Sequence, residues 1–252
     1  MRFASLGSGS RGNALVIESG ATRVLLDCGF GPRQLAKRLS RLSLSPPQFD
    51  ALLVTHEHSD HVSGVAACAR QYGIGVFLTH GTLAATDLAT GAATVIDSHT
   101  AFAIGDLAVT PFPVPHDARE PVQFVVSDGA CRLGVVTDAG SVTAHMVAML
   151  SGCEALVIEC NQDVDMLRAG PYPAPLQQRI AGRLGHLDNA AAAGLLERLD
   201  RRRLQHVVAA HLSQENNTPQ LARTALARVL ACTDEWITVA DQATGFGWRE
   251  IV

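Results

Sequence analysis

The sequence predicts a single α/β domain in which two β layers lie between two layers of helices, a four-layer αββα sandwich. Three observations support this fold class. The chain has 252 residues and is 47% hydrophobic, which is enough apolar surface for one large core. Strand-like runs dominate the first 30 residues and the region 75–138, whereas helices and strands alternate after residue 141. No low-complexity linker interrupts residues 1–252, so we expect one domain.

The N-terminal third contains both strands and helices. Short β-rich runs separated by Gly-containing turns predict strands at 2–6, 14–19 and 22–29. Helical spacing follows at 32–41, and the Pro-containing segment 43–50 ends it. Residues 51–55 form a short continuous apolar run, typical of a buried parallel strand, and 62–73 is expected to be helical.

The rest of the chain divides into a strand-rich part and an alternating part. Strands are expected at 75–80, 94–98, 101–106, 107–115, 122–129 and 131–138, with Ser-Asp-Gly-Ala-Cys as a hairpin turn. Further on, helices are expected at 142–150, 175–185, 189–200 and 218–230, and strands at 154–160 and 206–211.

Composition narrows the classes of function. A net charge of −4 provides no large basic surplus to coat a nucleic-acid backbone. No window of 18 apolar residues predicts a transmembrane helix, and the N-terminus lacks a signal-peptide pattern, so the cytoplasm is the expected compartment. The six cysteines include no C-x-x-C pair and are interpreted as reduced, mostly buried side chains. A homo-oligomer stays an open alternative.

The strongest chemical signal is the motif His56-Glu57-His58-Ser59-Asp60-His61, which follows the apolar run 51–55. From extended backbone, His56 and His58 can point the same way, and Asp60 and His61 come from the turn that starts the next helix. Imidazoles suit zinc and similar ions, and carboxylates suit harder ions. This mixture fits two adjacent metal sites.

Two metal ions need further ligands, and polar residues at the ends of apolar strands are the candidates. His116 ends Leu-Ala-Val-Thr-Pro-Phe-Pro-Val-Pro-His, Asp138 ends Cys-Arg-Leu-Gly-Val-Val-Thr-Asp, and His211 ends His-Val-Val-Ala-Ala-His. A strand end is a usual place for a ligand carried by a rigid scaffold. Together with the motif, these residues complete a set of seven candidate ligands.

The order Thr-His-Glu-His-Ser-Asp-His, His116, Asp138, His211 resembles the metallo-β-lactamase superfamily. Within it, Leu-Gly-Ser-Gly-Ser-Arg-Gly-Asn, Val-Leu-Leu-Asp-Cys-Gly, Gly-His-Leu-Asp-Asn and His-Leu-Ser-Gln-Glu-Asn-Asn-Thr-Pro resemble the YycJ (WalJ) group over essentially the whole chain. The resemblance implies a metallo-β-lactamase-type sandwich and a DNA 5′→3′ exonuclease related to ribonuclease Z and small phosphodiesterases.

The resemblance also implies roles for the candidate ligands. The first metal would take His56, His58 and His116; the second would take Asp60, His61 and His211; Asp138 would bridge the two. Asp27 would be the buried acid that props the motif. Zinc is expected first and manganese second. Two such ions would supply a water-derived nucleophile and Lewis-acid polarisation for in-line displacement at phosphorus.

His186, in Gly-His-Leu-Asp-Asn, matches a histidine that protonates the leaving oxygen in ribonuclease Z relatives. Asp60 and His186 are therefore the expected catalytic residues. Two departures from the group are Asp188, where it has Ser, and Gln162, where it has His. Glu159 either orients His186 or is a structural acid at a strand end.

Three alternatives stay open at this level. The loop 7–13 either cradles a phosphate with Arg11 beside it or is an ordinary connection. Arg33, Lys37 and Arg41 share a helix face, which is either solvated or tracks a nucleic-acid backbone. DNA phosphodiesterase activity is the leading hypothesis, and hydrolysis of esters, thioesters or lactones is the alternative, because the same metal pair can attack a carbonyl.

Overall fold

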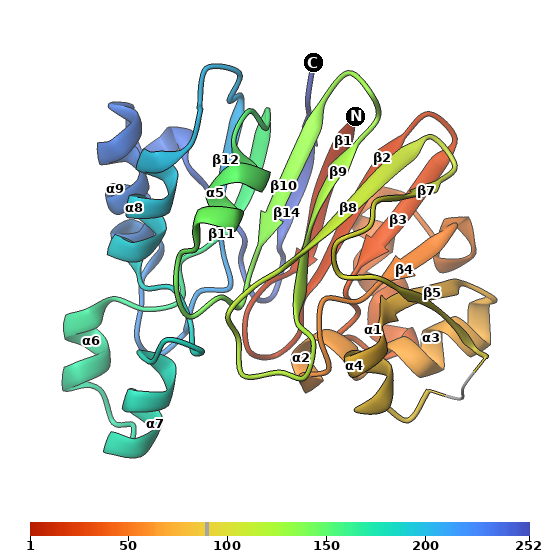
Figure 1. Ribbon diagram of the computed structural model, residues 1–252, viewed down its shortest axis with the longest axis horizontal. Coiled ribbons are helices and arrows are strands. Elements are labelled where there is room, and N and C mark those ends of the chain that lie inside the picture. Colours follow the sequence, from red (N-terminus) through yellow and green to blue (C-terminus); the bar gives the residue numbers. More distant parts are fainter. Residues whose placement is uncertain (89–90) are drawn as a thin grey trace.

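The computed structural model describes residues 1–88 and 91–252, and it contains two seven-stranded sheets (Figure 1). The first sheet has the order β14-β1-β2-β3-β4-β5-β6 and the second β13-β12-β11-β10-β9-β8-β7. The strands of the first sheet are β1 (Arg2–Gly7), β2 (Ala14–Ser19), β3 (Thr22–Leu26), β4 (Ala51–Leu53), β5 (Gly75–Thr79), β6 (Ala93–Ile96) and β14 (Phe246–Glu250). Those of the second are β7 (Phe102–Ile104), β8 (Leu107–Pro113), β9 (Val122–Ser127), β10 (Arg132–Val136), β11 (Ala155–Glu159), β12 (His206–Ala210) and β13 (Thr238–Val239).

Helices cover the outer faces of both sheets. On the first sheet's side are α1 (Pro32–Leu39), α2 (Ser59–Val62), α3 (Val65–Tyr72) and α4 (His80–Ala84). On the other side are α5 (Ala144–Leu150), α6 (Val164–Ala169), α7 (Ala174–Ile180), α8 (Asn189–Arg198) and α9 (Pro219–Leu230). Short 3₁₀ turns lie at Ser40–Leu42, Pro46–Gln48 and Asp234–Trp236. In Figure 1, α6 and α7 extend beyond the body formed by the sheets.

Three buried clusters show how the layers pack. The central one joins the inner faces of the two sheets, for example Ile17 of β2 with Phe124 of β9. A second joins the other sheet to α5, α8 and α9, and a third joins the first sheet to α1 and α3. Each fully buried Leu or Phe stabilises the fold by roughly 1.5–3 kcal/mol. The expected αββα sandwich is confirmed.

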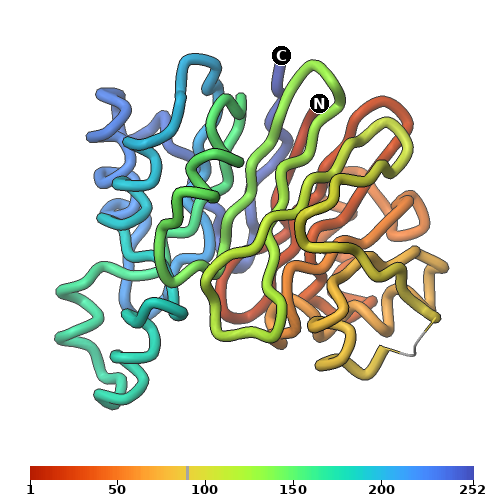
Figure 2. Tube along the Cα trace, in the orientation of Figure 1, coloured from red at the N-terminus to blue at the C-terminus, as the bar shows by residue number. Residues whose placement is uncertain are grey.

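The strand directions place the ends of several strands at one edge. β3, β4, β5 and β6 run parallel, as do β10, β11, β12 and β13. The carboxyl ends of parallel strands meet at the same edge of a sheet, where α/β proteins usually bind ligands. The two chain termini lie at the opposite end of the sandwich, where β1 and β14 pair (Figure 2).

The structure corrects several element boundaries. The helix expected at 62–73 starts earlier and is divided into α2 and α3, with Gly64 at the N-cap of α3. Only glycine fits there, because a Cβ at Gly64 would lie 2.0 Å from the carbonyl oxygen of Phe30. The helix expected at 175–185 ends at Ile180, whose carbonyl accepts a hydrogen bond from the backbone of His186 (2.9 Å). β14, α4 and α6 were not predicted; β14 is held mainly by its pairing with β1, a partner that is remote in the sequence.

Two further expectations concern the chain as a whole. That residues 1–252 form one domain stays a prediction. Within the described ranges, no helix has both the length and the apolar character needed to cross a membrane.

Candidate metal centre

The motif of residues 56–61 lies at the edge where the carboxyl ends of the strands meet. His56 follows β4 and is buried, and His58 caps the N-terminus of α2 in extended conformation. Asp60 and His61 belong to α2 itself. The motif therefore changes from extended to helical backbone at His58, which is why its four side chains converge in spite of their short spacing.

Asp27 holds the loop of residues 55–61 in place through contacts with Thr55 and His61. It follows β3 with a left-handed backbone (φ 61°), and one oxygen, Oδ1, accepts hydrogen bonds from the backbone N–H (2.9 Å) and hydroxyl (3.1 Å) of Thr55. The other oxygen lies 2.8 Å from Nδ1 of His61. A carboxylate at Nδ1 leaves Nε2 of the imidazole to bind a metal. The position of Asp27 agrees with the propping role that the resemblance implies.

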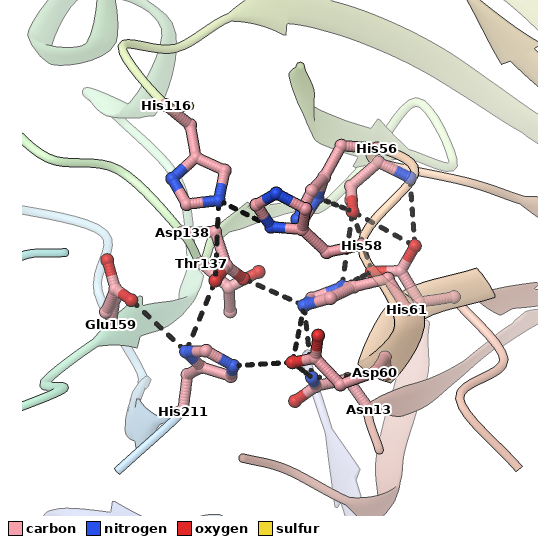
Figure 3. Close-up of polar contacts among 12 residues, drawn as sticks. Asn13, His56, His58, Asp60, His61, His116, Thr137, Asp138, Glu159 and His211 are labelled. Carbon is pink, nitrogen blue, oxygen red and sulfur yellow. Dashed lines mark hydrogen bonds and ion pairs between the residues drawn. The ribbon is translucent and has the colours of Figure 1, made fainter. Parts of the chain in front are cut away.

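Three histidines form the first half of the site. His56, His58 and His116 each offer a ring nitrogen within 4.8 Å of the others (Figure 3). His116 Nδ1 donates to the carbonyl oxygen of Gly185 (3.0 Å), and its Nε2 lies 3.1 Å from Nδ1 of His58. The backbone contact fixes the ring of His116 so that Nε2 points to the other two histidines.

The second half combines Asp60, His61 and His211, whose ligand atoms also lie within 4.8 Å of one another. Oδ2 of Asp60 is 3.3 Å from Nε2 of His61 and 3.2 Å from Nε2 of His211. Asp138 lies between the halves: its Oδ2 is 3.0 Å from His61 and its Oδ1 is 4.0 Å from His116. The structure thus brings together all seven candidate ligands, with Asp138 in the middle.

The donor set fits divalent metal ions. Nε2 of His56 and Oδ2 of Asp138 are buried without a hydrogen-bond partner, although Oδ2 of Asp138 faces Nε2 of His61. A buried polar atom without a partner is costly, and a metal ion would satisfy both atoms. The opposite nitrogen of His56 contacts the hydroxyl of Thr55 (3.0 Å), which leaves Nε2 as the ligand atom. These His/Asp clusters support divalent metal binding.

The electrostatics of the two halves differ. Burial lowers the pKa of His56 and of His116, so these imidazoles are neutral, the form that binds metals. Burial opposes charge on His211 as well, but the carboxylate of Asp138 and the hydrogen bond to Asp60 outweigh it and raise the pKa of His211 to about 10. The carboxylates of Asp60 and Asp138 thus bring negative charge to the second half, and divalent ions would offset it.

His186 lies beside this cluster and is held by Glu159. Nδ1 of His186 is 2.8 Å from Oε1 of Glu159, which is fully buried at the end of β11. The same oxygen is 3.2 Å from Nδ1 of His211. Of the two roles left open for Glu159, the geometry favours the orienting one, and it extends to His211 as well.

Asn13 is a contact that the sequence did not predict. Its side-chain amide donates to Oδ2 of Asp60 (3.1 Å) and lies 3.1 Å from Nε2 of His61, while its Oδ1 accepts from the backbone of Gly9 (2.8 Å). The loop 7–13 is therefore tied to the second half of the site through Asn13. Only the Asn at the end of the Gly/Ser-rich segment could have signalled this, since Asn often bonds to nearby backbone in turns.

The two departures from the group have structural explanations. Asp188 caps the N-terminus of α8, with its carboxylate accepting from the backbone of Ala191 (2.7 Å). Ser and Asp are both good N-caps, so this exchange leaves His186 in place. Gln162 is buried, and its amide donates to the carbonyl oxygen of His186 (3.3 Å). It supports the backbone of His186 instead of offering a metal ligand.

The basic helix face is partly occupied by structural contacts. Arg41 of the predicted basic face Arg33, Lys37 and Arg41 donates to the carbonyl oxygens of Leu6 (2.9 Å) and Ala243 (3.2 Å). Arg41 lies in the 3₁₀ turn that follows α1, and it thereby ties this turn to β1 and to the segment that precedes β14. This favours a structural role for Arg41 over one in following a nucleic-acid backbone.

The cluster opens into a cavity of about 310 Å³. Its walls come from the loop 7–13, the histidine motif and the α7 region, and they are lined by Ser10, His58, Ser59, Asp60, Asp117, Asp138, Leu176, Arg179, Ile180, Gly185, His186 and His211. His186 and the metal cluster therefore face the same space, where a substrate could reach both.

A family model described as the beta-lactamase superfamily domain matches residues 22–211, more than half of the chain. The chain belongs to the metallo-β-lactamase superfamily. Among curated members of the superfamily, an exodeoxyribonuclease YycJ of Bacillus anthracis is 34% identical over 91% of this chain and 89% of its own. An exodeoxyribonuclease WalJ of Streptococcus pneumoniae is 33% identical over 92% of this chain and 89% of its own. The resemblance to the YycJ (WalJ) group is confirmed.

Solved structures of the superfamily share the fold. The metallo-beta-lactamase fold protein YhfI from Bacillus subtilis has a TM-score of 0.76 at 16% identity, and the similarity covers 98% of each chain. Human tRNase Z, short form, has a TM-score of 0.68 at 17% identity and full coverage of both chains. Family membership and the His/Asp clusters together identify this superfamily member as a metal-dependent hydrolase.

Proposed function

We propose that this protein is a two-metal-dependent phosphodiesterase that acts on DNA as a 5′→3′ exonuclease. The observation that carries the proposal is the pair His186–Glu159 beside the His/Asp cluster, on the wall of the same cavity. A phosphodiester has a poorly leaving alkoxide, so its hydrolysis benefits from a positioned acid. An activated ester or lactone has less need of one.

The seven clustered residues would hold the metal ions, zinc first and manganese second. The first ion would be bound by His56, His58 and His116 and the second by Asp60, His61 and His211, with Asp138 between them. Ions in such a pair supply Lewis-acid polarisation of the phosphate and a water-derived nucleophile at neutral pH. Asp60 therefore counts as a catalytic residue as well as a ligand.

His186 would deliver the proton that the leaving oxygen needs. Burial opposes the charged form of His186, but the carboxylate of Glu159 and its hydrogen bond outweigh burial and raise the pKa of His186. This raised pKa favours the imidazolium, the form that carries the proton to be donated. Glu159 holds Nδ1, so Nε2 is the nitrogen that remains to serve the substrate.

DNA as the substrate draws support from the relatives. Both the Bacillus anthracis and the Streptococcus pneumoniae proteins bear the name exodeoxyribonuclease, and each matches about nine-tenths of this chain. We keep the cytoplasm as the expected compartment, because DNA is found there in bacteria such as these.

The test is a substrate panel with the zinc- or manganese-loaded protein. A single-stranded oligonucleotide with a 5′ label reports direction, because a 5′→3′ exonuclease releases the label at once as a mononucleotide. Cleavage from the 3′ end would produce a ladder of labelled fragments. Bis-p-nitrophenyl phosphate and a set of lactones, esters and thioesters complete the panel.

We expect hydrolysis of DNA and of the aryl phosphodiester, and close to two metal ions per chain by elemental analysis. Turnover of lactones, esters or thioesters without phosphodiester hydrolysis would replace the proposal with the alternative. Well under one ion per chain after metal supplementation would contradict the two-metal site.

A further inference from the structure

Arg179 of α7 lines the cavity proposed to bind the substrate. Among the described residues that line the cavity, it is the only Lys or Arg, and the acidic lining residues are Asp60, Asp117 and Asp138. A phosphodiester strand that enters this space meets several carboxylates. Within this described lining, Arg179 is the permanently cationic side chain that can offset them outside the metal cluster.

α7 presents Arg179 together with two apolar side chains. Leu176, Arg179 and Ile180 are spaced i, i+3 and i+4, so they share one helix face, and all three line the cavity. α7 has no buried residue of its own, and 36% of Leu176 is exposed. α7 therefore packs little against the rest of the protein, and this face is free to contact a ligand.

The end of α7 is nevertheless fixed to the metal site. Three backbone carbonyls after the helix accept hydrogen bonds from residues of the site: Gly185 from Nδ1 of His116 (3.0 Å), Leu184 from the backbone of Asp117 (3.0 Å) and Arg183 from the hydroxyl of Ser141 (3.2 Å). Arg179 lies one turn before this anchored segment. Its position relative to the metal cluster is therefore set by the fold.

Asp117 is the partner of Arg179 in the structure. Nε of Arg179 is 2.6 Å from Oδ2 of Asp117, and 62% of the arginine side chain is exposed. An ion pair this exposed is weak and is readily exchanged for another anion. The guanidinium can bind a phosphate through two parallel N–H donors, which is stronger than a single contact.

From this arrangement we infer that Arg179 binds the DNA phosphate next to the scissile one, releasing Asp117, while Leu176 and Ile180 contact the intervening deoxyribose. This subsite rests on the proposed function and deepens it. We assign Arg179 to the neighbouring phosphate, and not to the scissile one, because of the position of Asp117. Oδ1 of Asp117 faces the histidines, 3.8 Å from Nε2 of His58 and 3.6 Å from Nε2 of His116. Asp117 thus stands between Arg179 and the cluster that would hold the scissile group.

The experiment compares Arg179→Ala with Arg183→Ala. Arg183 is an exposed arginine four residues later that is not among the cavity-lining residues. Both variants are assayed as metal-loaded proteins on an oligothymidine and on bis-p-nitrophenyl phosphate, which has no neighbouring phosphate. A second strand carries one uncharged methylphosphonate linkage next to the scissile phosphate.

We expect Arg179→Ala to raise KM for DNA about 10- to 100-fold, the usual effect of losing a hydrogen bond to a charged group, with kcat little changed. Its KM for the aryl phosphodiester should not change, and Arg183→Ala should match the wild type on both. The uncharged linkage should raise KM for the wild type but not for Arg179→Ala. For Arg179→Ala on DNA, the slope of log kcat/KM against log salt concentration should be smaller in magnitude than that of the wild type by about 0.7.

The outcomes distinguish a failure of the subsite from a failure of the proposed function. If the wild type cleaves DNA and Arg179→Ala has the KM and salt slope of Arg183→Ala, the subsite is wrong and the proposed function stands. If Arg179→Ala lowers kcat/KM equally for DNA and for the aryl phosphodiester, Arg179 acts at the scissile phosphate or on the fold. The subsite is again wrong in that case. A wild type that cleaves no phosphodiester overturns the proposed function and the subsite with it.

Discussion

Glu159 anchors His186 with an oxygen 2.8 Å from Nδ1, and its other oxygen accepts hydrogen bonds from the backbone of Ala139 (2.9 Å) and Leu187 (3.0 Å). The carboxylate is fully buried, so it has no freedom to leave these partners. A histidine held this firmly beside a metal cluster is suited to deliver a proton in a fixed direction.

His186→Ala should slow DNA hydrolysis by about 10²–10⁴-fold in kcat, the usual contribution of general-acid catalysis. The loss on bis-p-nitrophenyl phosphate should be much smaller, because p-nitrophenolate leaves without protonation. Metal content should stay that of the wild type. Steady-state kinetics on both substrates and elemental analysis provide the measurements.

The control for this prediction is His145→Ala, which removes an exposed histidine outside the clusters. It should behave as the wild type on both substrates. Equal losses on the two substrates in His186→Ala would point to substrate positioning. Loss of metal would make His186 a ligand, and the ligand assignment would have to be redrawn.

Asp138→Ala should abolish hydrolysis and lower the metal content while the protein stays folded. Asp138 lies between the two halves of the cluster, so its loss would weaken both ions together. Circular dichroism and elemental analysis check the two parts of the prediction. Asp165→Ala, which removes a largely exposed carboxylate on α6, is the control. Retained turnover with unchanged metal content would show that Asp138 is not a bridging ligand.

Asn13→Ala should weaken metal binding about 10- to 100-fold, the usual cost of losing a residue that orients a ligand. The amide of Asn13 donates a hydrogen bond to Oδ2 of Asp60. The methyl group of an alanine at position 13 cannot donate that bond. Titration of the metal-free protein with zinc in competition with a chelator measures the change without any turnover.

Gln242→Ala is the matched control for Asn13. Its side chain supports the same loop, accepting from the backbone of Arg11 (2.8 Å) and donating to the carbonyl oxygen of Gly12 (3.0 Å), but it does not contact Asp60. We expect its zinc affinity to equal that of the wild type. If both variants lose affinity to the same extent, the position of the loop matters and the Asn13 amide has no specific role.

Asp128 should make stability depend on pH in the acid range. Burial would raise the pKa of Asp128, but hydrogen bonds from the backbone of Cys131 and the hydroxyl of Ser19 outweigh it and lower the pKa to about 2. A depressed pKa in the folded state stabilises the protein above the unfolded value near 4, and this stabilisation is lost as pH falls toward 2.

Asp128→Asn should therefore cost about 1 kcal/mol of unfolding free energy at pH 7, after allowance for solvent screening. The difference from the wild type should shrink when denaturant unfolding is repeated at pH 3. A difference that is the same at both pH values would mean that the charge of Asp128 contributes nothing and that the substitution acts through shape.

The elements that the sequence predicted best are those with a strong local period. The run 51–55, the hairpin between β9 and β10 and the helix α9 all have partners or turns close by in the chain, and the structure contains all three. β14 has its partner at the other end of the sequence, in β1. A strand of five residues with a glycine in its interior carries too weak a pattern to be recognised without that partner.

The ligand candidates followed from the sequence for a similar reason. His116, Asp138 and His211 each come at the end of an apolar run, so their chemistry is visible locally even though their meeting point is not. Asp138 and His211 also adopt left-handed backbone (φ 55° and 54°), which turns each side chain toward the cluster. Such a conformation costs energy for a residue other than glycine and is maintained by tertiary contacts.

By itself, the sequence determined the chemical types of the site, the fold class and the family, because those depend on residue identity, spacing and hydrophobic period. Only the tertiary structure decided that Asn13 holds Asp60, that Glu159 serves both His186 and His211, and that Arg179 pairs with Asp117 at the cavity wall. Each of these contacts joins side chains from separate elements. Their distances depend on how the sheets and helices pack, which no local pattern in the chain records.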